Sequence, residues 1–85
     1  MADGTGADAA FTPRQGRYLA FTYWYTKLNR LPPAEADFVR YFEVSAPSVH
    51  QMIKKLHADG WISRTPGQAR SIRLLVSRER LPDLE

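Results

Sequence analysis

The chain has 85 residues, a formal net charge of +3 at neutral pH and 44% hydrophobic residues, a balance that is ordinary for one small globular domain. The absence of cysteine excludes disulfides, thiolate metal sites and a cysteine nucleophile. No apolar run approaches the roughly 18 to 20 residues of a membrane span, and the first ten residues lack the features of a signal peptide. We therefore expect a cytoplasmic protein without membrane contact.

The positive charge is concentrated in the middle of the chain. Between Thr12 and Val76 there are ten Lys or Arg residues against four acidic residues, which gives this section a charge of +6. A compact domain with such an excess either binds a polyanion or uses the charge for solubility.

The first helix is predicted from Pro13 to Leu28 or Asn29. Residues 1–11, rich in Gly, Ala and Asp, precede it and are expected to be disordered. Thr12 is typical of an N-cap, and Gln15 three positions later completes a capping-box pattern. The face expected to pack on the core carries Tyr18, Phe21, Trp24, Tyr25 and Leu28.

Leu19 and Tyr23 fall almost opposite that face. Apolar residues on the outer side of a helix in a small domain need something to cover them. Two alternatives stay open: a terminal segment of the chain packs over them, or they form a homodimer or partner interface.

A second helix is predicted at about residues 34–42, after two prolines that disfavour helix before them. Its expected inward residues are Ala36 and Val39, with Phe38 and Phe42 as further candidates.

The third helix begins after the N-cap Ser45 and ends near Gly60, with Val49, Met52, Ile53 and Leu56 as its buried stripe. It starts only three or four residues after the second helix. This spacing is typical of the helix-turn-helix, whose second helix reads DNA.

Two β-rich runs, residues 61–65 and 71–76, follow the third helix. Pro66-Gly67 between them suits a type II turn, because glycine tolerates a positive φ at the second central position. Three helices followed by a two-stranded hairpin predict an α+β winged helix-turn-helix fold over residues 12–76. Residues 77–85 form a tail that either frays or docks through Leu81 and Leu84.

The outer face of the third helix carries small, hydrogen-bonding and basic residues and no carboxylate, so it suits the major groove. Gln51 pairs well with adenine, and Lys54 with guanine or phosphate. Ser45 and Ser48 lie at the positive end of the helix, where a phosphate binds readily. Pro47 is a candidate for contact with a thymine methyl group, and His50 and Lys55 are candidates for phosphate. Each of these has the alternative of an ordinary capping, packing or solvated residue.

In the predicted wing, Arg70 near the loop tip and Arg73 on the outward strand face are candidates for nucleic-acid contact, since arginine favours narrow minor grooves. Neither has an obvious carboxylate partner in the sequence. Arg64 on the facing strand is a further candidate. Other basic residues of the chain, among them Arg14, are expected to be solvated or paired with acids, with a few touching phosphates.

The sequence offers no sign of a metal site or an enzyme. His50 and His57 are seven residues apart and thus about 10 Å apart along a helix, too far for one ion, and no cysteine or nearby carboxylate completes a site. A phosphate-cradling Gly-rich loop, a nucleophile elbow and a paired-carboxylate motif are all missing. We expect no catalytic residue, metal, cofactor or small-molecule ligand.

Five stretches in this order resemble the DNA-binding domain of LexA repressors: TPRQ at 12–15, LPP at 31–33, VSAPSVHQM at 44–52, DGWI at 59–62 and RSIRLL at 70–75. The opening of the third helix is also common among MarR-type winged helices. The resemblance implies a winged-helix domain that binds duplex DNA, with the third helix in the major groove and the wing near the backbone or minor groove.

Two departures from LexA limit what the resemblance implies. The third helix is about one residue shorter after its proline, so base-reading positions are not carried over one by one. The Ser–Lys pair of the LexA peptidase domain has no counterpart in these 85 residues, so self-cleavage is not expected.

We therefore interpret the chain as a sequence-specific binder of double-stranded DNA, a prokaryotic transcriptional regulator that plausibly acts as a homodimer. The alternative is a winged-helix module for protein–protein interaction that docks through the aromatic face of the first helix.

Overall fold

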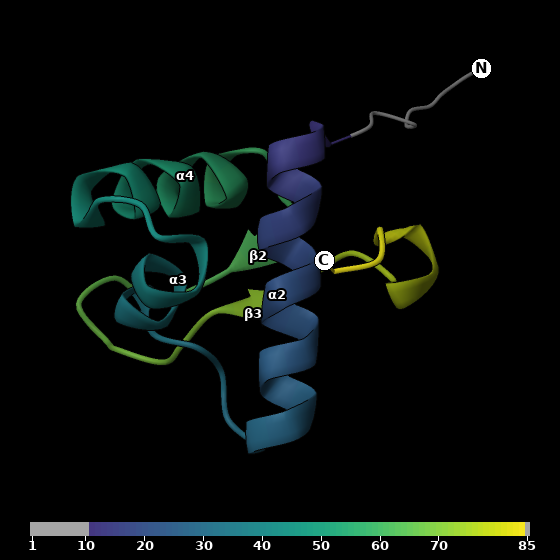
Figure 1. Cartoon of the computed structure of the whole chain (residues 1–85), viewed down its shortest axis with the longest axis horizontal. Helices are drawn as coiled ribbons and strands as arrows, with labels where there is room; N and C mark the ends of the chain where they lie inside the picture. Colours follow the sequence, from purple (N-terminus) through teal and green to yellow (C-terminus); the bar gives the residue numbers. More distant parts are fainter. Residues whose placement is uncertain (1–10, 85) are drawn as a thin grey trace.

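The structure is a computed structural model that describes residues 11–84 of the chain. Three helices, α2 (Pro13–Asn29), α3 (Glu35–Phe42) and α4 (Ala46–Ala58), are followed by two short strands, β2 (Ile62–Ser63) and β3 (Arg73–Leu74), and by a 3₁₀ turn, η1 (Arg78–Arg80). In Figure 1, α2 stands between the C-terminal segment on one side and α3, α4 and the hairpin on the other. The predicted α+β winged helix-turn-helix fold is confirmed.

Helix α2 begins with the predicted capping box. The side chain of Thr12 accepts a hydrogen bond from the amide of Gln15, and the amide of Thr12 donates to the side chain of Gln15. Both orphan donors of the first turn are satisfied in this way. The helix ends at Asn29. Its C-cap Arg30 has a left-handed φ of 63°, which prevents further helical hydrogen bonds.

The predicted core face of α2 is confirmed at Tyr18 and Phe21, which are buried, and at Tyr25, which packs against the core, but it is wrong at Leu28. The inner stripe contains Gln15, Tyr18, Leu19 and Thr22, whereas Leu28 is 75% exposed. Gln15 and Thr22 are polar, so the sequence pattern did not indicate that this stripe faces the core. Thr22 is accommodated because its hydroxyl donates to the carbonyl of Tyr18 four residues earlier, which removes the cost of burying an unpaired polar group.

Helices α3 and α4 form the predicted helix-turn-helix. Ala34 and Ser45 are their N-caps, and Ser45 accepts the amide of Ser48. Val49, Ile53 and Leu56 are fully buried and Met52 is partly buried, as expected. On α3, Phe38 is buried and Val39 and Phe42 pack against the core. Ala36 is exposed, contrary to the prediction, because the larger Phe38 takes the inner position.

The hairpin pairs β2 with β3 in antiparallel register, Ile62 opposite Leu74 and Ser63 opposite Arg73. Both strands are shorter than the runs that predicted them. The turn between them is as expected: Gly67 has a φ of +78° and the amide of Gln68 donates to the carbonyl of Thr65. Between the strands, the chain forms a loop without strand pairing. In this loop, Arg70 has a positive φ of 58° and its side chain contacts Asp37 on α3.

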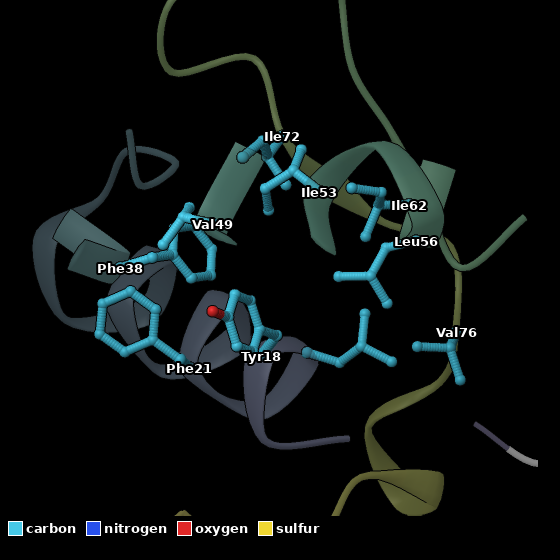
Figure 2. Close-up of a cluster of buried hydrophobic side chains, with 10 residues drawn as sticks. Tyr18, Phe21, Phe38, Val49, Ile53, Leu56, Ile62, Ile72 and Val76 are labelled. Atoms are coloured by element: carbon cyan, nitrogen blue, oxygen red, sulfur yellow. The ribbon is translucent and has the colours of Figure 1, made fainter. Parts of the chain in front are cut away.

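The core lies where α2, α3, α4 and the hairpin meet (Figure 2). Its buried members include Ile62, Ile72 and Val76 from the hairpin segment, so the strands close the end of the helical bundle. Two strands alone are marginally stable in water. Packing on the helices is what stabilises this hairpin.

The C-terminal segment docks on α2 rather than fraying. Leu81 and Leu84 pack against the core, and the guanidinium of Arg80 lies 5.3 Å from the ring centroid of Trp61. A Cβ atom on Gly16 would lie 3.0 Å from the ring of Phe11 and 3.2 Å from that of Pro82. The glycine is therefore what lets this segment approach the helix closely.

Candidate nucleic-acid interface

The outer face of α4 is open and basic. Ser48, Gln51, Lys54 and Lys55 are exposed and line a shallow depression of about 620 Å³ together with Met52, Ala58 and Arg14. No acidic residue lines this depression. The predicted reading face of the third helix is thus present as one surface.

Arg14 is a member of this surface that sequence reasoning missed. It belongs to the first turn of α2, which is held beside the end of α4 by a 3.0 Å hydrogen bond from the side chain of Gln15 to Asp59. This bond also holds the pKa of the Asp59 carboxyl below its usual value, with help from Lys55. Residues 15 and 59 are far apart in sequence, so no local signal could have placed Arg14 next to Lys54.

The first turn of α4 is exposed at Ser45, Pro47 and Ser48. The hydroxyl of Ser45 accepts the amide of Ser48 at 3.2 Å and donates to the hydroxyl of Ser48 at 2.9 Å. Capping therefore accounts for the position of Ser45. Contact of these residues with DNA stays a prediction.

The side chain of Glu35 on α3 contacts two of the residues that were predicted to bind DNA. One of its carboxylate oxygens lies 3.1 Å from Nδ1 of His50 and 4.0 Å from the guanidinium of Arg64. The side chain of Arg64 is only 17% exposed, and its Nε is buried without a hydrogen-bond partner. His50 and Arg64 therefore face α3, and Arg64 has little surface left for a ligand.

Arg70 has a carboxylate partner, contrary to the expectation from the sequence. One of its terminal nitrogens donates to the carboxylate of Asp37 at 3.2 Å, and to the hydroxyl of Tyr25 and the carbonyl of Pro32 at 3.1 Å each. These bonds raise the pKa of the Arg70 guanidinium above its usual value, Tyr25 contributing most. The side chain is bound to the protein itself, because tertiary folding brings α3 to the wing.

The remaining basic candidates differ in whether they pair with an acidic residue. Lys55 lies 3.3 Å from the carboxylate of Asp59, four residues later on the same face. Lys54 and Arg73 make no ion pair with any residue between 11 and 84 that the structure describes. Arg73 is exposed on the outer strand and lines a depression of about 310 Å³ with the wing loop.

Leu19 is not an interface residue. Its exposure is 0% and it belongs to the core cluster, so the prediction that it lies opposite the core is wrong. Tyr23 is partly buried, and the guanidinium of Arg78 stands 5.4 Å from its ring centroid. The C-terminal segment therefore covers Tyr23 in part, and an interface there stays a prediction.

Within residues 11–84, no group of three or more His, Asp or Glu side chains is placed to hold a metal ion. Among the helices of that same range, none combines the length and the apolar character needed to cross a membrane.

The chain matches no family model, but it is similar to curated LexA repressors. It is 31% identical over 75 residues to the LexA repressor of Magnetococcus marinus, 35% over 69 residues to that of Acidithiobacillus ferrooxidans, and 35% over 78 residues to that of Cupriavidus taiwanensis. These alignments cover 80–88% of this chain and 32–36% of the relatives.

The chain thus spans about one third of the length of the LexA repressors that it matches. Its helix order, hairpin and capping motifs agree with the resemblance drawn from the sequence. Over most of its length, this chain is therefore similar to LexA repressors, and its fold is a winged helix-turn-helix.

Proposed function

We propose that this chain is the DNA-binding domain of a transcription regulator and reads duplex DNA with α4 in the major groove. The observation that carries the proposal is the exposed depression on α4, which Gln51 shares with basic residues of two helices and which no acidic side chain among residues 11–84 lines. A helix is about 10–12 Å wide with its side chains, which matches the roughly 12 Å width of the major groove. Similarity to proteins named as repressors supports the same function.

Within this surface, the residues divide into base-reading and phosphate-binding groups. The amide of Gln51 suits the bidentate pattern of adenine, and Lys54 reaches guanine or a phosphate. Arg14 and Lys55 border the depression and are assigned to phosphates, which supply most of the affinity and fix the register. Lys55 gives up its contact with Asp59 at little cost, because exposed ion pairs contribute little to stability.

Two further regions complete the proposed contact. The first turn of α4, with Ser45, Pro47, Ser48 and the neighbouring His50, lies at the positive end of the helix, where a phosphate is favoured and the serine hydroxyls can contact it. In the wing, Arg73 is the proposed contact with the backbone or minor groove, because its side chain is exposed and unpaired among residues 11–84.

A homodimer on paired half-sites belongs to the same proposal. A single module of this size buries roughly 600–1,000 Å² on DNA, which is small for tight specific binding. Sedimentation of the protein with and without operator DNA measures the stoichiometry.

The test is selection from a pool of random duplex DNA, titrated at several salt concentrations and followed by sequencing of the retained fraction. Binding that weakens steeply with salt together with an enriched motif supports the proposal. Retention without a motif contradicts the sequence-specific part, and no retention at low salt contradicts DNA binding as a whole.

The protein-interaction alternative has two observations in its favour. The acids Glu35 and Asp59 interrupt the positive surface, and Leu28 at the end of α2 is 75% exposed. If the protein does not bind DNA at low salt, and Leu28→Ala abolishes its binding to a protein partner, the chain is a docking module.

A further inference from the structure

The first turn of α3 is joined to both elements that the proposed function places on DNA. Glu35 contacts His50 on α4 and Arg64 just after β2. Asp37 contacts Arg70 in the loop of the wing. Two acids on one turn thus connect the proposed reading helix and both limbs of the hairpin.

Asp37 is the more deeply placed of the two acids. Its side chain is 7% exposed, and it accepts hydrogen bonds from the amide of Ala34 at 2.8 Å, from Arg40 at 2.9 Å and from Arg70 at 3.2 Å. The first of these bonds caps α3, and the second is a local pair on the same helix. The third reaches the wing, and the hydroxyl of Tyr25 adds a link from Asp37 to α2.

The side chain of Arg70 is held by several contacts with other elements. The nitrogen that meets Asp37 also meets the hydroxyl of Tyr25 on α2 and the carbonyl of Pro32 in the connection before α3. The guanidinium carbon lies 5.9 Å from the centroid of the Tyr25 ring. The side chain is 43% exposed, but turning this nitrogen outward to a phosphate would break three contacts at once.

The wing depends on this attachment because its own ladder is short. Only two residue pairs, Ile62 with Leu74 and Ser63 with Arg73, form the sheet. Within the loop, the hydroxyl of Ser71 accepts the amide of Thr65 and contacts the carbonyl of Gln68. These bonds shape the loop, but they do not fix it relative to α4.

We propose that Asp37 is a positioning residue for DNA binding, which holds the wing at a fixed place relative to α4 through Arg70, and that Arg70 is not itself a DNA contact. This inference rests on the proposed function of the α4 face. In this arrangement, Arg73 on the outward face of β3 makes the wing's contact with DNA. The role of Arg70 is to keep Arg73 in place.

The inference makes a prediction opposite to that of simple electrostatics. Removing an acid from a protein that binds a polyanion strengthens binding if only net charge matters. If Asp37 positions the wing, Asp37→Asn weakens binding instead, on the order of tenfold, an effect within the range for coupled residues of one hydrogen-bond network. Glu43→Gln, which removes an exposed acid at the C-cap of α3, is the matched control and should leave affinity equal or slightly higher.

Two further measurements separate positioning from contact. The losses caused by Asp37→Asn and Arg70→Gln should not add in the double variant, because both break the same link. Arg70→Gln should also leave the salt dependence of binding unchanged, whereas Arg73→Gln should reduce its slope by about 0.9, the value for one phosphate contact. Additive losses, a reduced slope for Arg70→Gln, or full affinity of Asp37→Asn would each overturn the inference.

A readout without DNA keeps this test apart from that of the proposed function. In the free protein, Asp37→Asn should speed hydrogen exchange at the amides of Thr65 and Gln68 while leaving the amides of α4 unchanged. Tyr25→Phe removes one acceptor of Arg70 and one hydrogen bond to Asp37 but keeps the Asp37–Arg70 pair. It serves if Asp37→Asn does not fold, and should give a smaller effect in the same direction. Failure of the wild-type protein to bind DNA would contradict the proposed function, and unchanged wing exchange would contradict the positioning role.

Discussion

The guanidinium of Arg70 donates a 3.2 Å hydrogen bond to Asp37, thirty-three positions earlier in the chain. Arg70 reaches this position with a left-handed φ of 58°, a conformation that costs a non-glycine residue about 1–3 kcal/mol. The contacts with Asp37, Tyr25 and Pro32 offset that cost. The wing of this protein is therefore held by a specific polar contact as well as by packing.

Stability should fall in acid partly because of Asp37. Burial acts to raise the pKa of this carboxyl, but hydrogen bonds from Ala34 and Arg40 and the charge of Arg70 outweigh it and hold the pKa below its usual value. A carboxyl with a lowered pKa in the folded state stabilises the protein above its unfolded pKa, near 3.9, and loses this contribution as the pH falls further through the folded pKa.

Urea denaturation at pH 5, 4, 3 and 2 measures the effect. The free energy of unfolding of the wild-type protein should drop below about pH 4, and that of Asp37→Asn should start lower and drop less. Asp59→Asn is the comparison, because Asp59 also has a lowered pKa but lies at the surface. Equal slopes for wild type and Asp37→Asn would contradict the assignment.

Leu19→Ala should destabilise the fold strongly without affecting association. The side chain is fully buried, and deleting a buried leucine to alanine costs about 2–5 kcal/mol, a large part of the 5–15 kcal/mol available to a small domain. Leu28→Ala, at 75% exposure on the same helix, should change stability by less than about 0.5 kcal/mol. Thermal and urea unfolding measure both; a neutral Leu19→Ala that shifts a dimer equilibrium would reverse our placement of Leu19.

Gly16→Ala should lower stability although it improves helix propensity. The gain of about 1 kcal/mol expected in a helix is opposed by a Cβ lying 3.0 Å from Phe11 and 3.2 Å from Pro82, and overpacking of this kind costs about 1–3 kcal/mol. Thr26→Ala, on the exposed side of α2, controls for propensity. A rise in melting temperature for Gly16→Ala would show that the C-terminal segment moves aside without cost.

Gln51→Ala and Lys54→Gln should separate base reading from charge on the α4 face. Loss of the Gln51 amide should relax the preferred base at one position of the selected motif, at about 1–3 kcal/mol of discrimination. If Lys54 binds phosphate, Lys54→Gln should reduce the salt slope by about 0.9 and leave the motif unchanged. Binding titrations of matched and mismatched duplexes measure both effects; wild-type selectivity and affinity in both variants would remove α4 from the DNA surface.

Local chemistry explains which features were predicted correctly. The Thr12–Gln15 capping box, the Ser45 cap and the Pro66-Gly67 turn each depend on residues three or fewer positions apart, and all are present. The core stripe of α4 was also correct, because three β-branched or aliphatic residues at helical spacing leave one choice of inner face. That of α2 was correct at Tyr18 and Phe21 but not at Leu28 or Leu19, since the helix has apolar residues around most of its circumference.

The sequence by itself determined the order of the helices, the N-caps of α2 and α4, the turn of the hairpin and the basic outer face of α4, because each arises from neighbours along the chain. Only the tertiary structure decided that Leu19 lies in the core, that the C-terminal segment covers α2, and that Arg14 joins the α4 face. It also decided that Arg70 and Arg64 turn inward to Asp37 and Glu35. These are contacts between distant segments, and their partners become neighbours only when the helices and the hairpin have packed around one core.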